Sequence, residues 1–204
     1  MKVTIFDYGA GNLHSLAKAL ELDGIDVAIE TDPVLSIHTD VLVLPGVGAF
    51  GAAVDRLAPG RDTMQRAILD GLPTIGICLG MQLLFDASDE GGGAGLGVIP
   101  GRVTRIDAQR VPQIGWNEVV PAGDDALFAT APLPIAYYAN SFVCRPDDES
   151  SVIAWTTHEG DRFPAAVRAG RTVGVQFHPE KSSSDGVRFL HAFLQDAQRT
   201  GVAK

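Results

Sequence analysis

The first half of the chain alternates short apolar runs with segments of helical periodicity. Four runs have the length and composition of β-strands, residues 2–6, 26–30, 40–44 and 74–77. Two intervening segments carry apolar residues three and four positions apart: Leu13, Leu16, Ala17 and Leu20 in the first, and Met64, Ala67 and Ile68 of residues 62–70 in the second. Strands that alternate with helices predict right-handed crossovers and a parallel sheet covered on both faces.

The second half has a different pattern. From residue 97 to 176 the apolar residues lie in turn-bounded runs without clear helices, at 98–106, 113–120, 135–144, 151–157 and 165–176. Short runs of this kind favour antiparallel pairing, and Ala169-Gly-Arg-Thr172 is expected to split the last run into a hairpin. A final helix is expected after Ser182-Ser-Ser-Asp185, whose side chains suit an N-cap, with Val187, Leu190, Phe193 and Leu194 buried. These patterns predict one three-layer α/β domain, residues 1–204, with a mixed, mostly parallel sheet that gains antiparallel strands in its second half.

Composition narrows the possible functions. The 204 residues are 46% hydrophobic, which is enough for one well-packed core. The formal net charge of -9 argues against a nucleic-acid partner, because binding to a phosphate backbone depends on clustered Lys and Arg. No apolar run approaches the ~18 residues of a membrane span, and the N-terminus does not resemble a signal peptide, so we expect a cytoplasmic protein without a membrane partner.

Metal and cofactor sites are not indicated. Cys78 and Cys144 lie far apart without C-x-x-C spacing, and the histidines show no metal-ligand spacing. The turn after the first strand contains Gly9-Ala-Gly11, but His14 stands where a dinucleotide fingerprint needs its third glycine. The sequence therefore predicts neither a metal nor a cofactor.

Cys78 lies where an apolar strand passes into a helix-like segment. In Gly76-Ile-Cys78-Leu-Gly80 it has glycines two positions before and after it, the spacing of a nucleophile elbow. Small residues there let the chain bend tightly enough to present the central side chain. The alternative is a buried thiol that only packs, since free cysteine is among the most buried residue types.

A base and its orienting acceptor are found near the C-terminus. Val173-Gly-Val-Gln-Phe-His178-Pro-Glu180 ends an apolar strand, and residues two positions apart in an extended chain point to the same side. Glu180 is therefore expected to hold the His178 ring in one tautomer while the other nitrogen faces Cys78. The alternative is a surface His and Glu that flank a turn.

Backbone donors for a developing oxyanion are expected at two places. The loop Leu44-Pro-Gly46-Val47-Gly48 follows the third strand, at the sheet edge where α/β proteins bind ligands. Its glycines would let the Val47 amide approach a substrate beside the amide of Leu79, which follows Cys78. The alternative is a glycine loop that only turns the chain.

Together these stretches resemble the class I, triad-type glutamine amidotransferases over essentially the whole chain. The resemblance implies a flavodoxin-like three-layer fold, a catalytic triad of Cys78, His178 and Glu180, and release of ammonia from glutamine. Met81, Pro112-Gln-Ile-Gly-Trp-Asn117 and Lys181 are similar to the branch that contains the glutaminase subunits of imidazole glycerol phosphate synthase. Asn140 departs from that branch, which usually carries His there.

The same resemblance implies further roles. Glutamine would be held by Gly46, Gly48, Gln82, Ser141 and Phe142. The partner would be a (βα)8-barrel cyclase that uses the ammonia to make imidazole glycerol phosphate and an aminoimidazole carboxamide ribotide. Contacts with it would come from Asn12, Trp116, Tyr138 and Lys181.

Two other functions stay open at this point. The chain could be the glutaminase subunit of another pathway, such as anthranilate or aminodeoxychorismate synthase, although Met81 and Trp116 argue against this. It could also be a non-catalytic α/β module that uses a cysteine for redox sensing or binding. The complete triad argues against that class.

Overall fold

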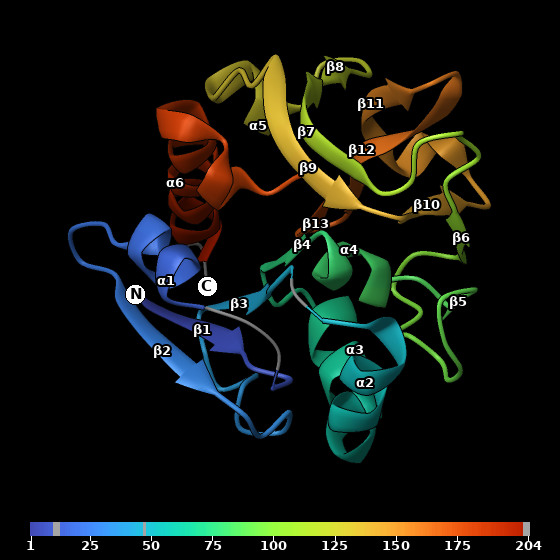
Figure 1. Cartoon of the computed structure of the whole chain (residues 1–204). Helices are drawn as coiled ribbons and strands as arrows, with labels where there is room; N and C mark the ends of the chain where they lie inside the picture. Colours follow the sequence, from blue (N-terminus) through green and yellow to red (C-terminus); the bar gives the residue numbers. More distant parts are fainter. Residues whose placement is uncertain (10–12, 47, 202–204) are drawn as a thin grey trace.

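An eight-stranded sheet runs through the centre of the molecule in the computed structural model, which describes residues 1–9, 13–46 and 48–201 (Figure 1). Five neighbouring strands are parallel: β2 (Asp26–Glu30), β1 (Lys2–Phe6), β3 (Val41–Leu44), β4 (Thr74–Ile77) and β13 (Thr172–Val175). The sheet continues with antiparallel β12 (Asp161–Ala169), β11 (Val152–His158) and β8 (Val120–Pro121). The predicted fold class, a mostly parallel sheet extended by antiparallel strands, is confirmed.

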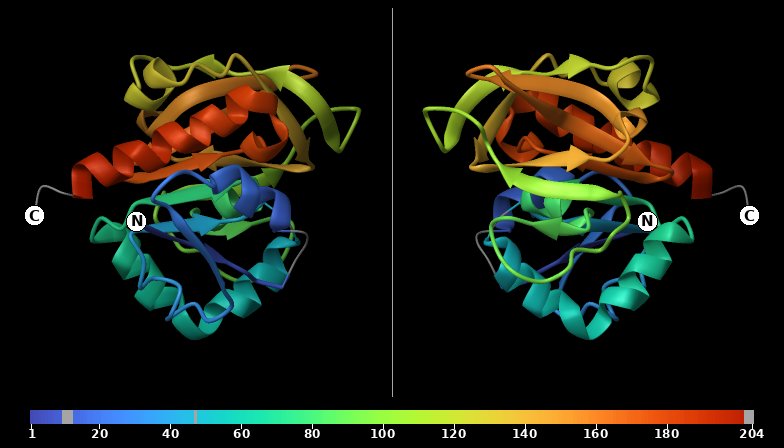
Figure 2. Two further views of the ribbon diagram at one scale, coloured as in Figure 1. Left: turned by 90° about the vertical axis from the view of Figure 1, so that its left-hand side faces the viewer. Right: turned by 90° about the vertical axis from the view of Figure 1, so that its right-hand side faces the viewer.

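Helices cover both faces of this sheet (Figure 2). On one face α1 (His14–Leu20) and α6 (Ser183–Gly201) share a core with Val41 and Val43 of β3. On the other face α2 (Phe50–Leu57) and α3 (Arg61–Leu69) share a core with Leu42 and Leu44 of the same strand. All four β3 residues are buried, which explains why that strand is apolar throughout and not alternating.

Two smaller sheets, which the apolar pattern did not predict, lie outside the central one. In the first, β7 (Gln113–Glu118) pairs with β9 (Ile135–Asn140). In the second, β10 (Phe142–Pro146) pairs with β6 (Gly101–Arg105), which pairs with β5 (Ala87–Ser88). The run 135–144 is thus divided at Ser141 between two sheets. The sequence did not predict this division, because the local alternation of residues does not specify which strands pair.

Several helical segments were not predicted. Helix α2 has buried residues at positions 50, 53, 54 and 57, so the helical pattern was present in the sequence. Helix α5 (Ala126–Thr130) has five residues, too few for a period to be recognised, whereas α4 (Leu79–Leu83) is the helix-like segment expected after Cys78. Single turns of 3-10 helix occur at η1 (Ala58–Gly60), η2 (Glu149–Ser151) and η3 (Pro179–Lys181).

Three strand ends meet at one edge of the central sheet. In register, Leu44 of β3 lies beside Gly76 of β4, and Ile77 of β4 lies beside Val175 of β13. The residues that follow, Pro45, Cys78 and Gln176, therefore leave the sheet side by side.

Among the described residues, no helix combines the length and the apolar content needed to cross a membrane.

Candidate active site

Cys78 sits on a strained turn between β4 and α4. Its backbone has φ 48° and ψ -103°, a left-handed conformation that side-chain-bearing residues rarely adopt. A Cβ atom on Gly76 would lie 2.5 Å from the carbonyl oxygen of Gly80, and one on Gly80 would overlap the carbonyl oxygen of Leu44. The two glycines are therefore required for the bend, as the spacing around Cys78 predicted.

The strain at Cys78 can be measured by comparing two substitutions. Glycine adopts positive φ without cost, so Cys78→Gly is expected to be about 1 kcal/mol more stable than Cys78→Ala in urea unfolding. At Cys144, inside strand β10, the same pair should show the opposite order, because glycine weakens strands. Equal stability of the two Cys78 variants would mean that the turn is unstrained.

His178 follows β13 and is oriented by Glu180 of η3. Its side chain is buried, and Nδ1 donates to Glu180 Oε1 over 2.9 Å. The backbone adds two restraints, since His178 N donates to the carbonyl of Tyr137 (2.8 Å) and Ser182 Oγ donates to the carbonyl of His178 (2.7 Å). Cys78 lies close enough to the ring to raise the pKa of His178. The structure thus brings together three residues that the sequence predicted as a triad.

Gly46 packs directly against this pair. A Cβ atom there would lie 2.9 Å from His178 Cε1 and 3.1 Å from Cys78 Cβ. Only glycine leaves room for the ring and the thiol to remain in contact. The loop after β3 therefore contributes its backbone to the site.

The triad opens into a cavity of about 320 Å³. Among its lining residues are those predicted to bind substrate, Gly46, Gly48, Gln82, Ser141 and Phe142, together with Leu79 and Lys181. Cys78 is 6% exposed, so the sulfur belongs to the core but is still reached from this cavity. A thiol that only packs would not line a cavity with an oriented imidazole.

Two polar lining residues were not assigned a role from the sequence. The first is Glu90, a carboxylate that lines the cavity. Its Oε2 accepts a hydrogen bond from the backbone N of Phe50 at the start of α2 (3.0 Å). The second is Asn140, whose Nδ2 donates to the carbonyl of Phe142 (3.1 Å). Glu90 stands in a loop with no motif around it, so no local signal could have identified it.

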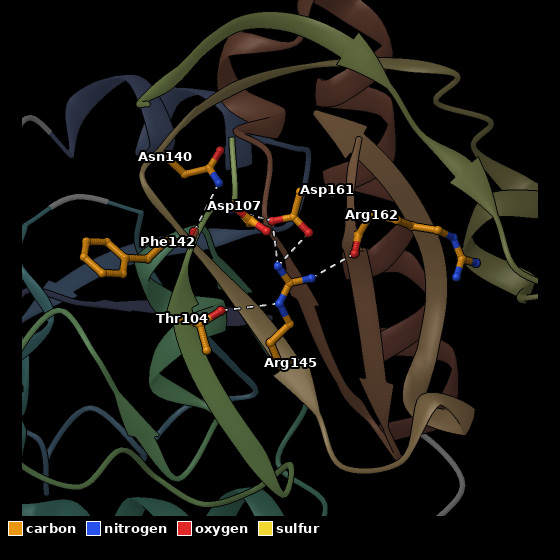
Figure 3. A network of polar contacts seen from close by, with 7 residues as sticks. All are labelled: Thr104, Asp107, Asn140, Phe142, Arg145, Asp161 and Arg162. Carbon is orange, nitrogen blue, oxygen red and sulfur yellow. Dashed lines mark hydrogen bonds and ion pairs between the residues drawn. The ribbon is translucent and has the colours of Figure 1, made fainter. Parts of the chain in front are cut away.

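A polar network holds the strand that forms this cavity wall (Figure 3). Arg145 of β10 donates to both carboxylate oxygens of Asp161 (2.7 and 2.6 Å), to the carbonyl of Arg162 (2.8 Å) and to Thr104 Oγ1 (3.3 Å). One guanidinium nitrogen, Nη2, makes both bonds to Asp161, and a hydrogen bond between charged groups is stronger than one between neutral groups. This ion pair anchors β10 to β12, so Phe142 at the start of β10 has a fixed position.

Comparison with known proteins agrees with this geometry. The family model described as glutamine amidotransferase class-I matches residues 4–197. The chain belongs to this family. Similar relatives named "Imidazole glycerol phosphate synthase subunit HisH" come from Halobacterium salinarum, 42% identical over 94% of this chain and 92% of the relative, and from Symbiobacterium thermophilum, 45% identical over 93% and 91%.

Solved structures support the same fold. A crystal structure of a glutamine amidotransferase superposes with a TM-score of 0.73 at 21% identity, covering 96% of this chain and 98% of that one. The glutaminase domain of a Trypanosoma brucei protein, CTPS, superposes with a TM-score of 0.65 at 16% identity, covering 95% and 93%. At these identities the likeness concerns the fold alone.

The residues predicted to contact a partner differ in how far they are exposed at the surface. Trp116 is 56% exposed on β7 and meets the Tyr137 ring edge-on at 6.2 Å. Lys181 is exposed at the cavity rim. Tyr138, however, is fully buried against Phe177, so the interface prediction for it is wrong: alternation along β9 turns Tyr138 inward and Tyr137 outward. Asn12 and the oxyanion candidate Val47 lie outside the described residues.

The protonation of His178 gives a testable pH dependence. Burial lowers its pKa, but the hydrogen bonds and negative charges of Cys78 and Glu180 outweigh burial and raise the pKa from 6.5 to about 9. Because the folded-state pKa is the higher one, its stabilising effect is complete below about pH 6.5 and is lost as the pH rises through about 9.

We expect the His178 ring to titrate near pH 9 in an NMR experiment and at lower pH in Cys78→Ala, because one of its two partners is removed. Stability measured against pH should show a decline in the same range. An unchanged titration midpoint in Cys78→Ala would contradict the contact between the thiol and the ring.

Proposed function

We propose that this chain is the glutaminase subunit of imidazole glycerol phosphate synthase, which hydrolyses glutamine and delivers the ammonia to a partner subunit in histidine biosynthesis. The observation that carries the proposal is the oriented Cys78–His178–Glu180 arrangement at a cavity, in a chain whose relatives bear that subunit's name at 42–45% identity over nine-tenths of both lengths. No cofactor is needed for this reaction.

The first half of the reaction uses Cys78 and His178. Because His178 keeps its proton near neutral pH, the pair can exist as thiolate and imidazolium. The thiolate attacks the side-chain amide carbon of glutamine and forms a tetrahedral oxyanion. The C–N bond then breaks while the imidazolium gives its proton to the departing nitrogen, which leaves ammonia and a glutamyl thioester on Cys78.

The second half regenerates the pair. Neutral His178 takes a proton from water, and the hydroxide adds to the thioester carbon. The C–S bond breaks, glutamate leaves, and the thiolate and imidazolium are restored. Glu180 holds the ring through Nδ1 in both halves.

Backbone and side-chain groups around the cavity suit the substrate. The amide of Leu79 follows Cys78 on the turn and would donate to the oxyanion, with Val47 as the second donor predicted from the sequence. The negative charge of Glu90 would hold the α-ammonium group of glutamine. Gly46, Gly48, Gln82, Ser141 and Phe142 form the remaining walls.

A (βα)8-barrel cyclase is the proposed partner. The outer face of β7 and β9 exposes apolar side chains, with Ile114 68%, Trp116 56% and Ile135 50% exposed. Tyr137 lies beside Trp116 on this face, and β9 leads directly into the cavity wall at Asn140. An exposed aromatic cluster beside the source of ammonia suits a subunit contact through which ammonia is passed on.

The test is glutamine hydrolysis by the chain alone and with the cyclase subunit bound to its own substrate. We expect hydrolysis in both cases, faster in the complex, and imidazole glycerol phosphate formed from glutamine only in the complex. Trp116→Ala should weaken complex formation, whereas Ile29→Ala, which removes a 52% exposed side chain from the far edge of the sheet, should not. Binding to a chorismate-using enzyme in place of the cyclase would refute the pathway.

A further inference from the structure

Gln176 is a buried polar residue that has no role in the reaction described above. It lies between the end of β13 and His178, and none of its surface is exposed. Its backbone N donates to the carbonyl of Ala165 (2.9 Å). Its side-chain Nε2 donates to Cys78 Sγ over 3.4 Å. A fully buried amide therefore contacts the sulfur that performs the reaction.

The orientation of this amide is set by Gln82. Gln82 Nε2 donates to the Gln176 Oε1 atom (3.5 Å) and to the carbonyl of Phe142 (3.1 Å). Since a side-chain amide has one donor end and one acceptor end, a donor at Oε1 turns the Nε2 end toward the sulfur. Asn140 Nδ2 donates to the same Phe142 carbonyl (3.1 Å), so the amides connect the cavity wall to Cys78.

We propose that Gln176 is a positioning residue for Cys78, which holds the sulfur by an N–H donor and favours its thiolate form. A hydrogen bond to a charged acceptor is stronger than one to a neutral acceptor, so the contact favours thiolate over thiol. The same donor stabilises the sulfur as a leaving group when the thioester is hydrolysed. Gln82 and the Phe142 carbonyl act through Gln176. This inference rests on the proposed role of Cys78 as the nucleophile.

Other titratable groups around the sulfur act differently. His178 follows β13 beside the sulfur, with Glu180 behind it. Tyr8 and Cys144 belong to the core on the other side of the sheet and are near enough for the Cys78 charge to raise their pKa values, to which burial contributes most. The Tyr8 hydroxyl donates to the carbonyl of Pro45. Gln176 does not titrate, so its donor is present at every pH at which the protein is folded.

The experiment measures alkylation of Cys78 by iodoacetamide at a series of pH values, with the Cys78 peptide quantified by mass spectrometry. Gln176→Met keeps the length of the side chain but removes the donor. We expect about tenfold slower alkylation near neutral pH and a profile displaced to higher pH. In the glutaminase assay kcat should fall while KM stays near the wild-type value. Gln176→Glu keeps an acceptor oxygen for Gln82 but lacks the N–H, and should also react slowly.

The matched control is Gln113→Met. Gln113 is another buried glutamine, 4% exposed, and neither of its side-chain polar atoms has a hydrogen-bond partner among the described residues. In Gln113→Met, Cys78 should be alkylated at the wild-type rate and glutamine should be hydrolysed at the wild-type rate. A wild-type pH profile in Gln176→Met, or an equal loss in Gln113→Met, would overturn the proposal.

Thermal unfolding shows whether Gln176→Met and Gln176→Glu are folded. A folded variant is sufficient for the test. Alkylation needs no glutamine, so it reports on Gln176 even if the proposed function fails. Absence of glutamine hydrolysis by the wild type would refute the function, whereas an unchanged alkylation profile would refute only the role of Gln176.

Discussion

Cys78→Ala is expected to lower kcat for glutamine hydrolysis on the order of 10⁴-fold or more, because removal of a covalent nucleophile leaves only binding and oxyanion stabilisation. The alanine side chain is smaller than the thiol and occupies the same turn, so the fold should persist. A glutamine-analogue electrophile should label the wild-type chain once, at Cys78, and should not label the variant.

Cys144→Ala is the matched control for this loss. Cys144 is the other free thiol, fully buried on β10, where burial raises its pKa and keeps it protonated. Its removal should cost some stability but leave kcat near the wild-type value. Substantial hydrolysis by Cys78→Ala, or a comparable loss in Cys144→Ala, would refute Cys78 as the nucleophile.

Gly80→Ala is expected to destabilise the protein by about 3 kcal/mol or more, measured by urea unfolding. The added Cβ would overlap the backbone carbonyl of Leu44, which cannot rotate away as a side chain can. Relief of the overlap requires α4 to move away from β3. Cys78 would move with it, so the remaining folded protein should also hydrolyse glutamine slowly.

Gly51→Ala provides the opposite expectation in the same protein. Gly51 lies in α2, and a Cβ there would meet its nearest neighbour, the Gly92 carbonyl oxygen, at 3.8 Å, which is ordinary contact. Alanine has the higher helix propensity, so this variant should gain up to about 1 kcal/mol. If both variants lost stability equally, the glycines around Cys78 would have no special requirement.

The local pattern was sufficient for the central sheet and for the turn at Cys78. β2 begins and ends where the apolar run 26–30 does, and the hairpin predicted at Ala169–Thr172 joins β12 to β13. The glycine spacing around Cys78 was informative because a nucleophile elbow depends on steric room, and steric room is visible in the sequence as glycine. His178 and Glu180 are paired as predicted, but the extended chain expected between them is wrong, because Pro179–Lys181 form the 3-10 turn η3, which brings Glu180 to the ring.

The local pattern could not predict which face of β9 is exposed or which residues lie beside the Cys78 sulfur. Both depend on pairing between distant strands. Either of the adjacent residues Tyr137 and Tyr138 could face outward, and a shift of one residue exchanges the two faces of a strand. Only the register of β9 with β7, which places Tyr137 opposite Trp116, decides between them. Gln176 is recognisable as a neighbour of the sulfur only once β13 lies beside β4.

The position of β13 between β4 and β12 has a consequence for synthesis of the protein. The nucleophile emerges from the ribosome with β4, but its base follows only with β13, about a hundred residues later, and that strand must be inserted between neighbours already made. Such long-range pairing is slow to form. A chain that ends before β13 therefore contains Cys78 without His178 and, on the proposed mechanism, consumes no glutamine.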